Sequence, residues 1–173
     1  MVDQRRRFYC LPGRKSQTLK KSVLLLLICN WVLLGTAAVM AFYAYPRLPQ
    51  KIPIWLNFFG QQTIMTDKSP LFFIYLLAQT LFFIFFLVMT RKISSRKMVP
   101  WKSHILKEYV YLTLVFFNLI FIHIQRSLIL VAHQVAQGVD KYYFYLLFAI
   151  ILVLIPYYRI RIKLFIRKPE ETI

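Results

Sequence analysis

The chain has 173 residues, of which 59% are hydrophobic, 17% are aromatic and 17% are charged. Its 23 Lys and Arg residues stand against 6 Asp and Glu residues, which gives a formal net charge of +17. A soluble domain averages about 45–50% apolar and about 25% charged residues, and a disordered chain carries far less apolar surface than this one. We therefore expect an integral membrane protein, provided that the apolar residues form runs of spanning length.

Four uncharged runs have the length of a membrane-spanning helix. A hydrocarbon core about 30 Å thick needs roughly 20 helical residues, and about 17–25 are tolerated. A helix also satisfies its own backbone hydrogen bonds in lipid. We predict an all-α fold, an integral membrane four-transmembrane-helix bundle, with helices at about 22–45, 69–90, 109–126 or longer, and 142–158. The membrane domain is then 22–158, with an outer loop at 46–68 and basic tails at 1–21 and 159–173.

The distribution of basic residues predicts the orientation. Most Lys and Arg residues lie in the two tails and in the segment between the second and third helices. The positive-inside bias therefore places both termini in the cytoplasm and the 46–68 loop outside. A net charge of +17 is also typical of nucleic-acid-binding proteins, but here the basic residues lie close to the helix ends. Topology and attraction to anionic lipids already explain them, so we expect no nucleic-acid partner.

Three amide side chains lie near the predicted midplane, each on a different helix. At a rise of about 1.5 Å per residue, Asn30 and Asn118 lie about 13 and 15 Å from the inner ends of their runs, and Gln79 lies about 16 Å from the outer end of its run. Such residues indicate either interhelical hydrogen bonds or a ligand or ion site. Because none of the three carries a charge, we favour interhelical hydrogen bonds.

Three small residues of the first helix, Ala37, Ala41 and Ala44, share one face. Small residues let helices approach closely, which matters because lipid supplies no hydrophobic drive between helices. We expect a packing seam here, either within the bundle or against another subunit.

The third helix carries the most polar residues. Relative to Asn118, helical projection places Gln125 at about −20°. In the same projection His133 lies at about 60° and Arg126 at about 80°. The three residues form a polar stripe that rises toward the outer face, where Arg126 can reach the headgroups by snorkelling. The sequence does not decide whether the helix continues past Arg126 or the following residues lie on the membrane surface.

Several catalytic and metal-binding patterns are missing from the sequence. No Asp or Glu lies inside a spanning run, whereas cation-coupled carriers usually need a carboxylate there. The GxSxG and HExxH motifs are absent, and the two cysteines form no zinc-binding pattern. We expect no enzyme activity, no metal site and no cofactor of the chain's own, with bound lipid as the ligand to look for. A haem or pigment shared with a histidine of another chain stays open.

The loop after the first helix is punctuated by proline. Pro46, Pro49 and Pro53 each fix φ and lack a hydrogen-bond donor, so a regular helix cannot continue there. Gly60 permits a turn, and the aromatic residues around Trp55 suit the headgroup level. We expect an ordered cap on the outer interface, with its aromatic side chains in lipid or against a partner.

This loop also resembles a known bacterial family. Its pattern Tyr-x-x-Leu-Pro-x-x-Ile-Pro, followed by an aromatic stretch with Asn and then by Gly, is similar to the domain of unknown function 1648. That domain precedes the transmembrane part of SdpI-type immunity proteins and also occurs in small multipass proteins. The resemblance covers residues 22–90, and its matching positions are Tyr45, Leu48, Pro49, Ile52, Pro53, Asn57 and Gly60.

The chain departs from the family pattern at one important position. Members typically carry His two residues after the second Pro of the motif, where this chain has Trp55. An acidic residue that commonly follows the Gly is also replaced, by Gln61, Gln62 and Thr63. The resemblance therefore implies a loop that keeps the family's shape without its polar chemistry.

These features favour a non-enzymatic accessory or structural subunit of a larger bacterial inner-membrane complex, with other membrane protein subunits and anionic lipids as partners. An SdpI-like immunity or signalling protein that binds a toxin or peptide at its outer loops is the alternative. A small transporter is a third hypothesis, and it needs a continuous polar path through the bundle.

Overall fold

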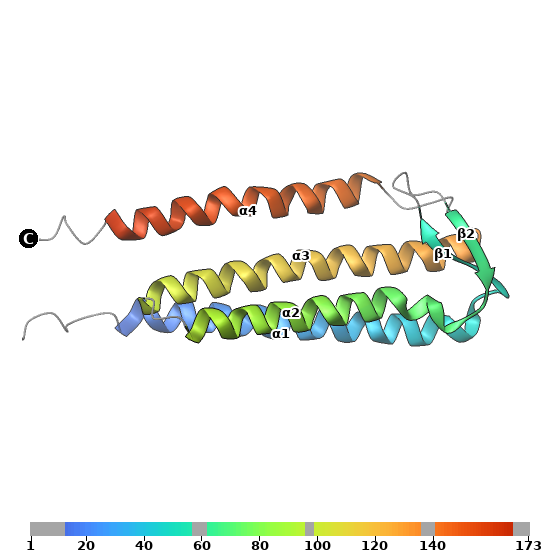
Figure 1. The fold of residues 1–173 in the computed structure, drawn as a ribbon, viewed down its shortest axis with the longest axis horizontal. Helices are drawn as coiled ribbons and strands as arrows, with labels where there is room; N and C mark the ends of the chain where they lie inside the picture. Colours follow the sequence, from blue (N-terminus) through green and yellow to red (C-terminus); the bar gives the residue numbers. More distant parts are fainter. Residues whose placement is uncertain (1–12, 57–61, 96–98, 136–140, 168–173) are drawn as a thin grey trace, which may run out of the picture.

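The computed structural model describes residues 13–56, 62–95, 99–135 and 141–167. Its main elements are four long helices that run along the length of the molecule (Figure 1). They are α1 (Gly13–Ala44), α2 (Ile74–Ser95), α3 (Pro100–Ala132) and α4 (Lys141–Arg167). Each contains a stretch long and apolar enough to cross a membrane, which confirms the predicted set of four candidate spanning helices.

The helices do not begin and end where the uncharged runs do. Both α1 and α3 begin well before their runs, at Gly13 and Pro100, and α4 continues to Arg167. Charges mark only the limits of the apolar part, because a helical backbone stays satisfied at the headgroup level, where Lys and Arg side chains reach water. The third helix continues past Arg126 to Ala132, which settles the alternative that the sequence left open.

The segment between α1 and α2 contains two strands that the sequence analysis did not predict. After the 3-10 turn η1 (Tyr45–Arg47) come β1 (Lys51–Leu56) and β2 (Gln62–Asp67). They pair antiparallel, with Lys51 opposite Asp67 and register shifts after Pro53. Pro53 cannot donate to the ladder, but a two-stranded hairpin consists of edge strands, where proline is tolerated. The all-α prediction is therefore correct for the bundle and wrong for this loop.

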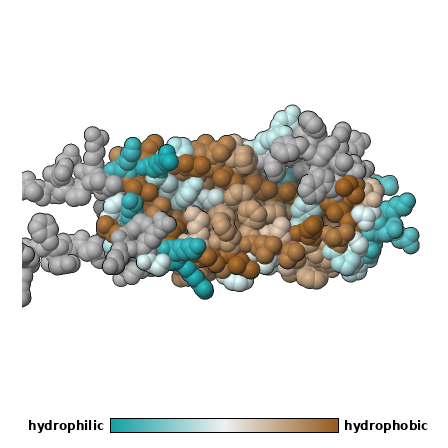
Figure 2. Space-filling model, viewed as in Figure 1, coloured by the Kyte–Doolittle hydropathy of each residue, from teal (hydrophilic) through white to brown (hydrophobic). Residues whose placement is uncertain are grey.

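The helix α3 is central to the bundle, because it packs against α1, α2 and α4. In Figure 1, α1 and α3 run in one direction and α2 and α4 run in the other. The start of α1 and the end of α4 therefore lie together at what we call the terminal end, and the strands lie at the opposite, hairpin end. Figure 2 shows hydrophobic side chains over the middle of one face and hydrophilic ones toward both ends.

Apolar clusters hold α3 to its neighbours at different heights. Toward the terminal end, Phe83 and Phe86 of α2 pack with Val110 and Leu114 of α3. On its other side, α3 packs against α4 through a smaller cluster of Ile120, Leu147 and Ile151.

The predicted alanine seam lies inside the chain. Ala37 and Ala41 have no exposed surface, and Ala44 is 9% exposed. At the hairpin end Ala41 belongs to a cluster with Ala132 of α3 and Ile52 of β1. Since buried side chains cannot contact another subunit, the seam serves packing within the bundle.

Candidate functional site

The three amides predicted at the midplane are directly hydrogen-bonded to one another. Gln79 Nε2 donates to Asn118 Oδ1 at 3.0 Å, and Asn118 Nδ2 donates to Asn30 Oδ1 at 2.8 Å. All three side chains are buried, with exposures of 0–1%. The amide chain thus joins α2, α3 and α1 in that order, with α3 in the middle.

The amide chain continues into the backbone and along α3. Asn30 Nδ2 also donates to the carbonyl oxygens of Leu26, at 2.8 Å, and of Tyr111, at 3.0 Å. About two helical turns toward the terminal end, the hydroxyls of Thr90 and Tyr111 lie 3.2 Å apart. These hydrogen bonds therefore hold helices together, as an interhelical hydrogen-bond set does.

The polar stripe predicted on α3 divides into an inward and an outward part. Gln125 is buried with no exposed surface, and neither polar atom of its amide has a hydrogen-bond partner within the part of the chain that the structure describes. Arg126 and His133 are exposed instead. The helical projection explains this division. Arg126 is rotated by about 100° around the helix axis from Gln125, so the two side chains leave α3 on different faces.

An ion pair that the sequence analysis missed joins α3 to α4. Arg161 Nη1 donates to Glu108 Oε1 at 2.7 Å, and the Tyr158 hydroxyl donates to the same oxygen at 3.2 Å. Arg161, which the sequence analysis assigned to the basic tail 159–173, therefore lies in α4 and contacts α3. Its neighbours Arg159 and Lys163 are exposed.

The coupling energy between Glu108 and Arg161 should be about 1–2 kcal/mol, less than for a fully buried pair because their side chains are 15% and 27% exposed. A double-mutant cycle of Glu108→Ala and Arg161→Ala, followed by unfolding in mixed micelles, measures this energy. Arg159→Ala, an exposed neighbour, should leave stability within about 0.5 kcal/mol. Strictly additive effects of the two substitutions would show that the pair does not stabilise the packing of α4 on α3.

The outer-loop motif faces the bundle with its apolar residues. Leu48, Ile52 and Pro53 are buried, whereas Pro49 is exposed. Tyr45 stacks near Phe72 and Phe73, with ring centroids 5.9 and 5.0 Å apart. The motif therefore closes the hairpin end of the bundle as a cap, in which Pro53 has a packing role.

Two polar side chains hold this cap in place: Lys68 bonds within the loop, and Tyr75 bonds to the loop from α2. Lys68 Nζ donates to the carbonyl oxygens of Pro46, at 2.9 Å, and Leu48, at 3.2 Å. The Tyr75 hydroxyl of α2 donates to the carbonyl oxygen of Ile54 at 3.1 Å. The backbone of Trp55 pairs with Ile64 in the hairpin. The Trp55 side chain, Asn57 and Gly60 lie outside the described part, so their predicted roles stay predictions.

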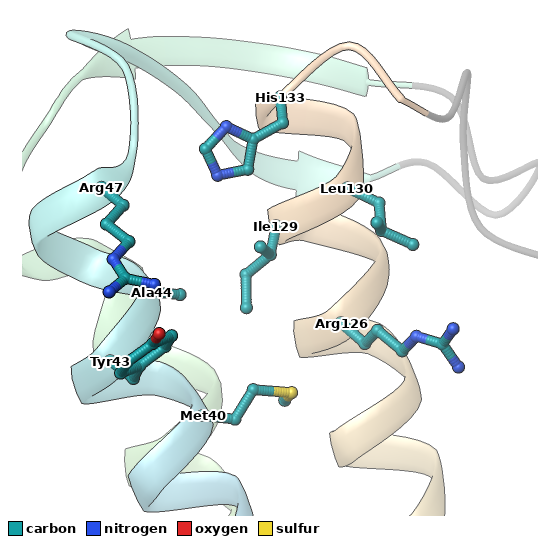
Figure 3. A pocket seen from close by; sticks show the side chains of 8 residues that line it. All are labelled: Met40, Tyr43, Ala44, Arg47, Arg126, Ile129, Leu130 and His133. Atoms are coloured by element: carbon teal, nitrogen blue, oxygen red, sulfur yellow. The ribbon is translucent and has the colours of Figure 1, made fainter.

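A shallow pocket of about 280 Å³ opens at the hairpin end between α1 and α3 (Figure 3). It brings together Arg126 and His133 of the predicted stripe with Arg47, which the sequence analysis did not select. Figure 3 shows the His133 ring turned toward α1 and the Arg126 side chain directed away from it. The Arg47 guanidinium lies 3.8 Å from the centroid of the Tyr43 ring.

The described residues contain no candidate metal site. Within the described ranges, His, Cys, Asp and Glu form no group of three that could hold a metal ion. The candidate sites are therefore the amide chain, the hairpin cap and the cationic pocket beside it.

Comparison with known proteins adds no relative to this picture. No family model, no curated protein and no solved structure matches the chain.

Proposed function

We propose that this chain is a non-enzymatic accessory subunit of a larger complex in a bacterial cytoplasmic membrane. In this proposal the four helices cross the bilayer, both termini lie in the cytoplasm and the hairpin lies outside. The concentration of basic residues near the terminal end supports that orientation through the positive-inside bias.

The observation that carries the proposal is that polar side chains inside the bundle bond from one helix to another. Asn30, Gln79 and Asn118 bond to one another across three helices, and Glu108 bonds to α4. Transport along the bundle axis would need polar groups free to bind a substrate. Within the described residues, the Gln125 amide and Gln79 Oε1 have no hydrogen-bond partner, but the bonds that join three helices suit a scaffold that keeps one shape while other chains bind to it.

The hairpin offers the surface for such a partner. Ile64 and Met65 of β2 are 53% and 52% exposed, although they lie beyond the ends of the spanning helices. Lipid tails cover exposed apolar residues in the spanning helices, but at this position two exposed apolar side chains, which point to opposite faces of β2 because they are consecutive, favour contact with another protein. We therefore place the principal partner contact of the proposed complex at β2.

The test is extraction of the full chain from native membranes in a mild detergent, followed by a mass measurement of the purified particle. We expect at least one other integral membrane chain at fixed stoichiometry. The variant Ile64→Lys with Met65→Lys should release that chain, because it places charge on the contact. A monomer free of other chains would refute the proposal.

A matched control keeps the same hairpin but leaves its apolar residues intact. Lys51→Asp with Asp67→Lys exchanges the exposed charges at the base of the hairpin, where the two residues lie opposite each other. Partner binding should survive this exchange. Loss of the partner in both variants would mean that hairpin folding, rather than the surface of Ile64 and Met65, controls assembly.

The alternative function, an SdpI-like immunity or signalling protein, has one structural observation in its favour. Within the described residues, β2 pairs with β1 on one side only. An extended peptide can add to such an edge by backbone hydrogen bonds. If a short secreted peptide, rather than a membrane subunit, co-purifies with the chain, this alternative is favoured.

A further inference from the structure

The pocket at the hairpin end has a cationic composition that the proposed function does not use. Three of its eight lining residues, Arg47, Arg126 and His133, have basic side chains, and none of the eight is acidic. The two guanidinium groups are permanently charged and present planar sets of donors that match phosphate oxygens. The pocket therefore has charge complementarity to a phosphate-bearing ligand.

These donors are not consumed by contacts within the described part of the chain. There, neither the Arg126 side chain nor the His133 ring has a hydrogen-bond or ion-pair partner. Arg47 stacks on Tyr43, which leaves the in-plane N–H groups of its guanidinium available. Lys68 is a nearby cation that is already engaged, because its ammonium group donates to two backbone carbonyls. It does not line the pocket.

The depth of Arg126 gives a reason for a ligand at this place. The candidate span of α1 ends at Arg47, and Arg126 precedes the last residue of α3 by about 9 Å of helix. In the proposed membrane orientation, Arg126 therefore lies slightly to the hydrocarbon side of the interface and is exposed. A charged side chain facing lipid is costly there, and a phosphate within reach would offset that cost.

An apolar surface continues from the pocket along α1. Met40, Ala44, Ile129 and Leu130 form the apolar part of its lining. A second depression, lined by Gly35, Thr36 and Val39, shares Met40 and Tyr43 with it. From Gly35 to Tyr43 this surface extends for about 12 Å, and a Cβ on Gly35 would meet no atom within 4 Å. An acyl chain has the shape and the polarity to lie there.

We propose that this pocket is a binding site for an anionic phospholipid of the outer leaflet. Arg47 and His133 hold the phosphate, Arg126, whose side chain is directed away from α1, adds positive charge at the rim of the pocket, and one acyl chain lies along α1 past Met40 to Gly35. A zwitterionic lipid fits less well, because its ammonium group would approach the same cations. The inference rests on the membrane insertion in the proposed function but not on an accessory role.

Native mass spectrometry of the delipidated full chain, titrated in detergent with phosphatidylglycerol, tests the site. Phosphatidylcholine and inorganic phosphate serve as separate probes. We expect phosphatidylglycerol to bind at least about tenfold more tightly than either, since it alone combines net charge with an acyl chain. Equal binding of phosphatidylcholine would indicate a non-selective lipid surface, and equal binding of phosphate would indicate an ion site; each result would overturn the proposal.

Three variants locate the binding on the molecule. Arg47→Gln with Arg126→Gln should weaken phosphatidylglycerol binding about tenfold or more. Gly35→Leu should weaken it about threefold by filling the acyl surface without a change in charge. The matched control, Arg91→Gln with Arg159→Gln, removes two exposed arginines elsewhere and should stay within about twofold of the unmodified chain.

The outcome separates this inference from the proposed function. Unchanged affinity in both pocket variants, with helical circular dichroism intact, would refute the lipid site and leave the accessory role standing. A chain that purifies from the soluble fraction would refute both. Release of a partner subunit from the hairpin variant has no bearing on the lipid titration.

Discussion

Asn118→Leu is expected to lower the free energy of unfolding by about 2–4 kcal/mol. Asn118 accepts a hydrogen bond from Gln79 and donates one to Asn30, so it is the central member of the amide chain. Its removal leaves two buried polar atoms, Asn30 Oδ1 and Gln79 Nε2, without these partners and without access to water. Equilibrium unfolding in mixed micelles, followed by the helical signal, measures the loss.

The control for Asn118 is a polar residue that bonds only within its own helix. Thr80 Oγ1 donates to the carbonyl oxygen of Leu76 at 2.8 Å, and the side chain is half-buried. Thr80→Val should change stability by less than about 0.5 kcal/mol. Asn118→Leu and Asn30→Leu should combine to less than the sum of their single effects, because they share one hydrogen bond. If Asn118→Leu and Thr80→Val lower the free energy of unfolding equally, the amide chain contributes no more to stability than a hydrogen bond within one helix.

The sequence predicted the height of the amides but not their pairing. Depth follows from a constant rise per residue, so Asn30, Gln79 and Asn118 could be placed at one level from their distance to the nearest charge. Which helix faces which depends on tertiary packing, and α3 became central through contacts that a single sequence does not display. The Glu108–Arg161 pair was missed for the same reason, since its members lie on helices whose neighbourhood was unknown.

The hairpin was the element least accessible to sequence reasoning. Proline at positions 46, 49 and 53 indicated a break in helix, and this interpretation holds at η1. The β-branched residues in Lys51–Leu56 and Gln62–Asp67 also favour strands, but Pro53 inside the first segment argues against one. Docking against α1 and α3 outweighs that local penalty, as the burial of Ile52 and Pro53 indicates. Arg47 was overlooked as a pocket residue because its position depends on this docking.

Ala41→Leu is expected to destabilise the chain by about 1–3 kcal/mol through overpacking. Ala41 has no exposed surface, and its neighbours in the cluster include Ile52 of β1, Phe72, which precedes α2, and Ala132 of α3. Three additional carbon atoms cannot enter this contact without moving α1 away from α3 or lifting the cap. The same unfolding assay in mixed micelles measures the effect.

The matched control for this change is Ala149→Leu, the same substitution at an exposed position of α4. It should stay within about 0.5 kcal/mol of the unmodified chain, because leucine and alanine both favour helix. Amide hydrogen exchange then shows where the strain is relieved. If the cap depends on the seam, Ala41→Leu should accelerate exchange in β1 and β2 more than around Val110, which lies in a separate cluster toward the terminal end. Uniform acceleration along the chain would mean that the hairpin and the bundle unfold as one unit and that the seam has no particular connection to the cap.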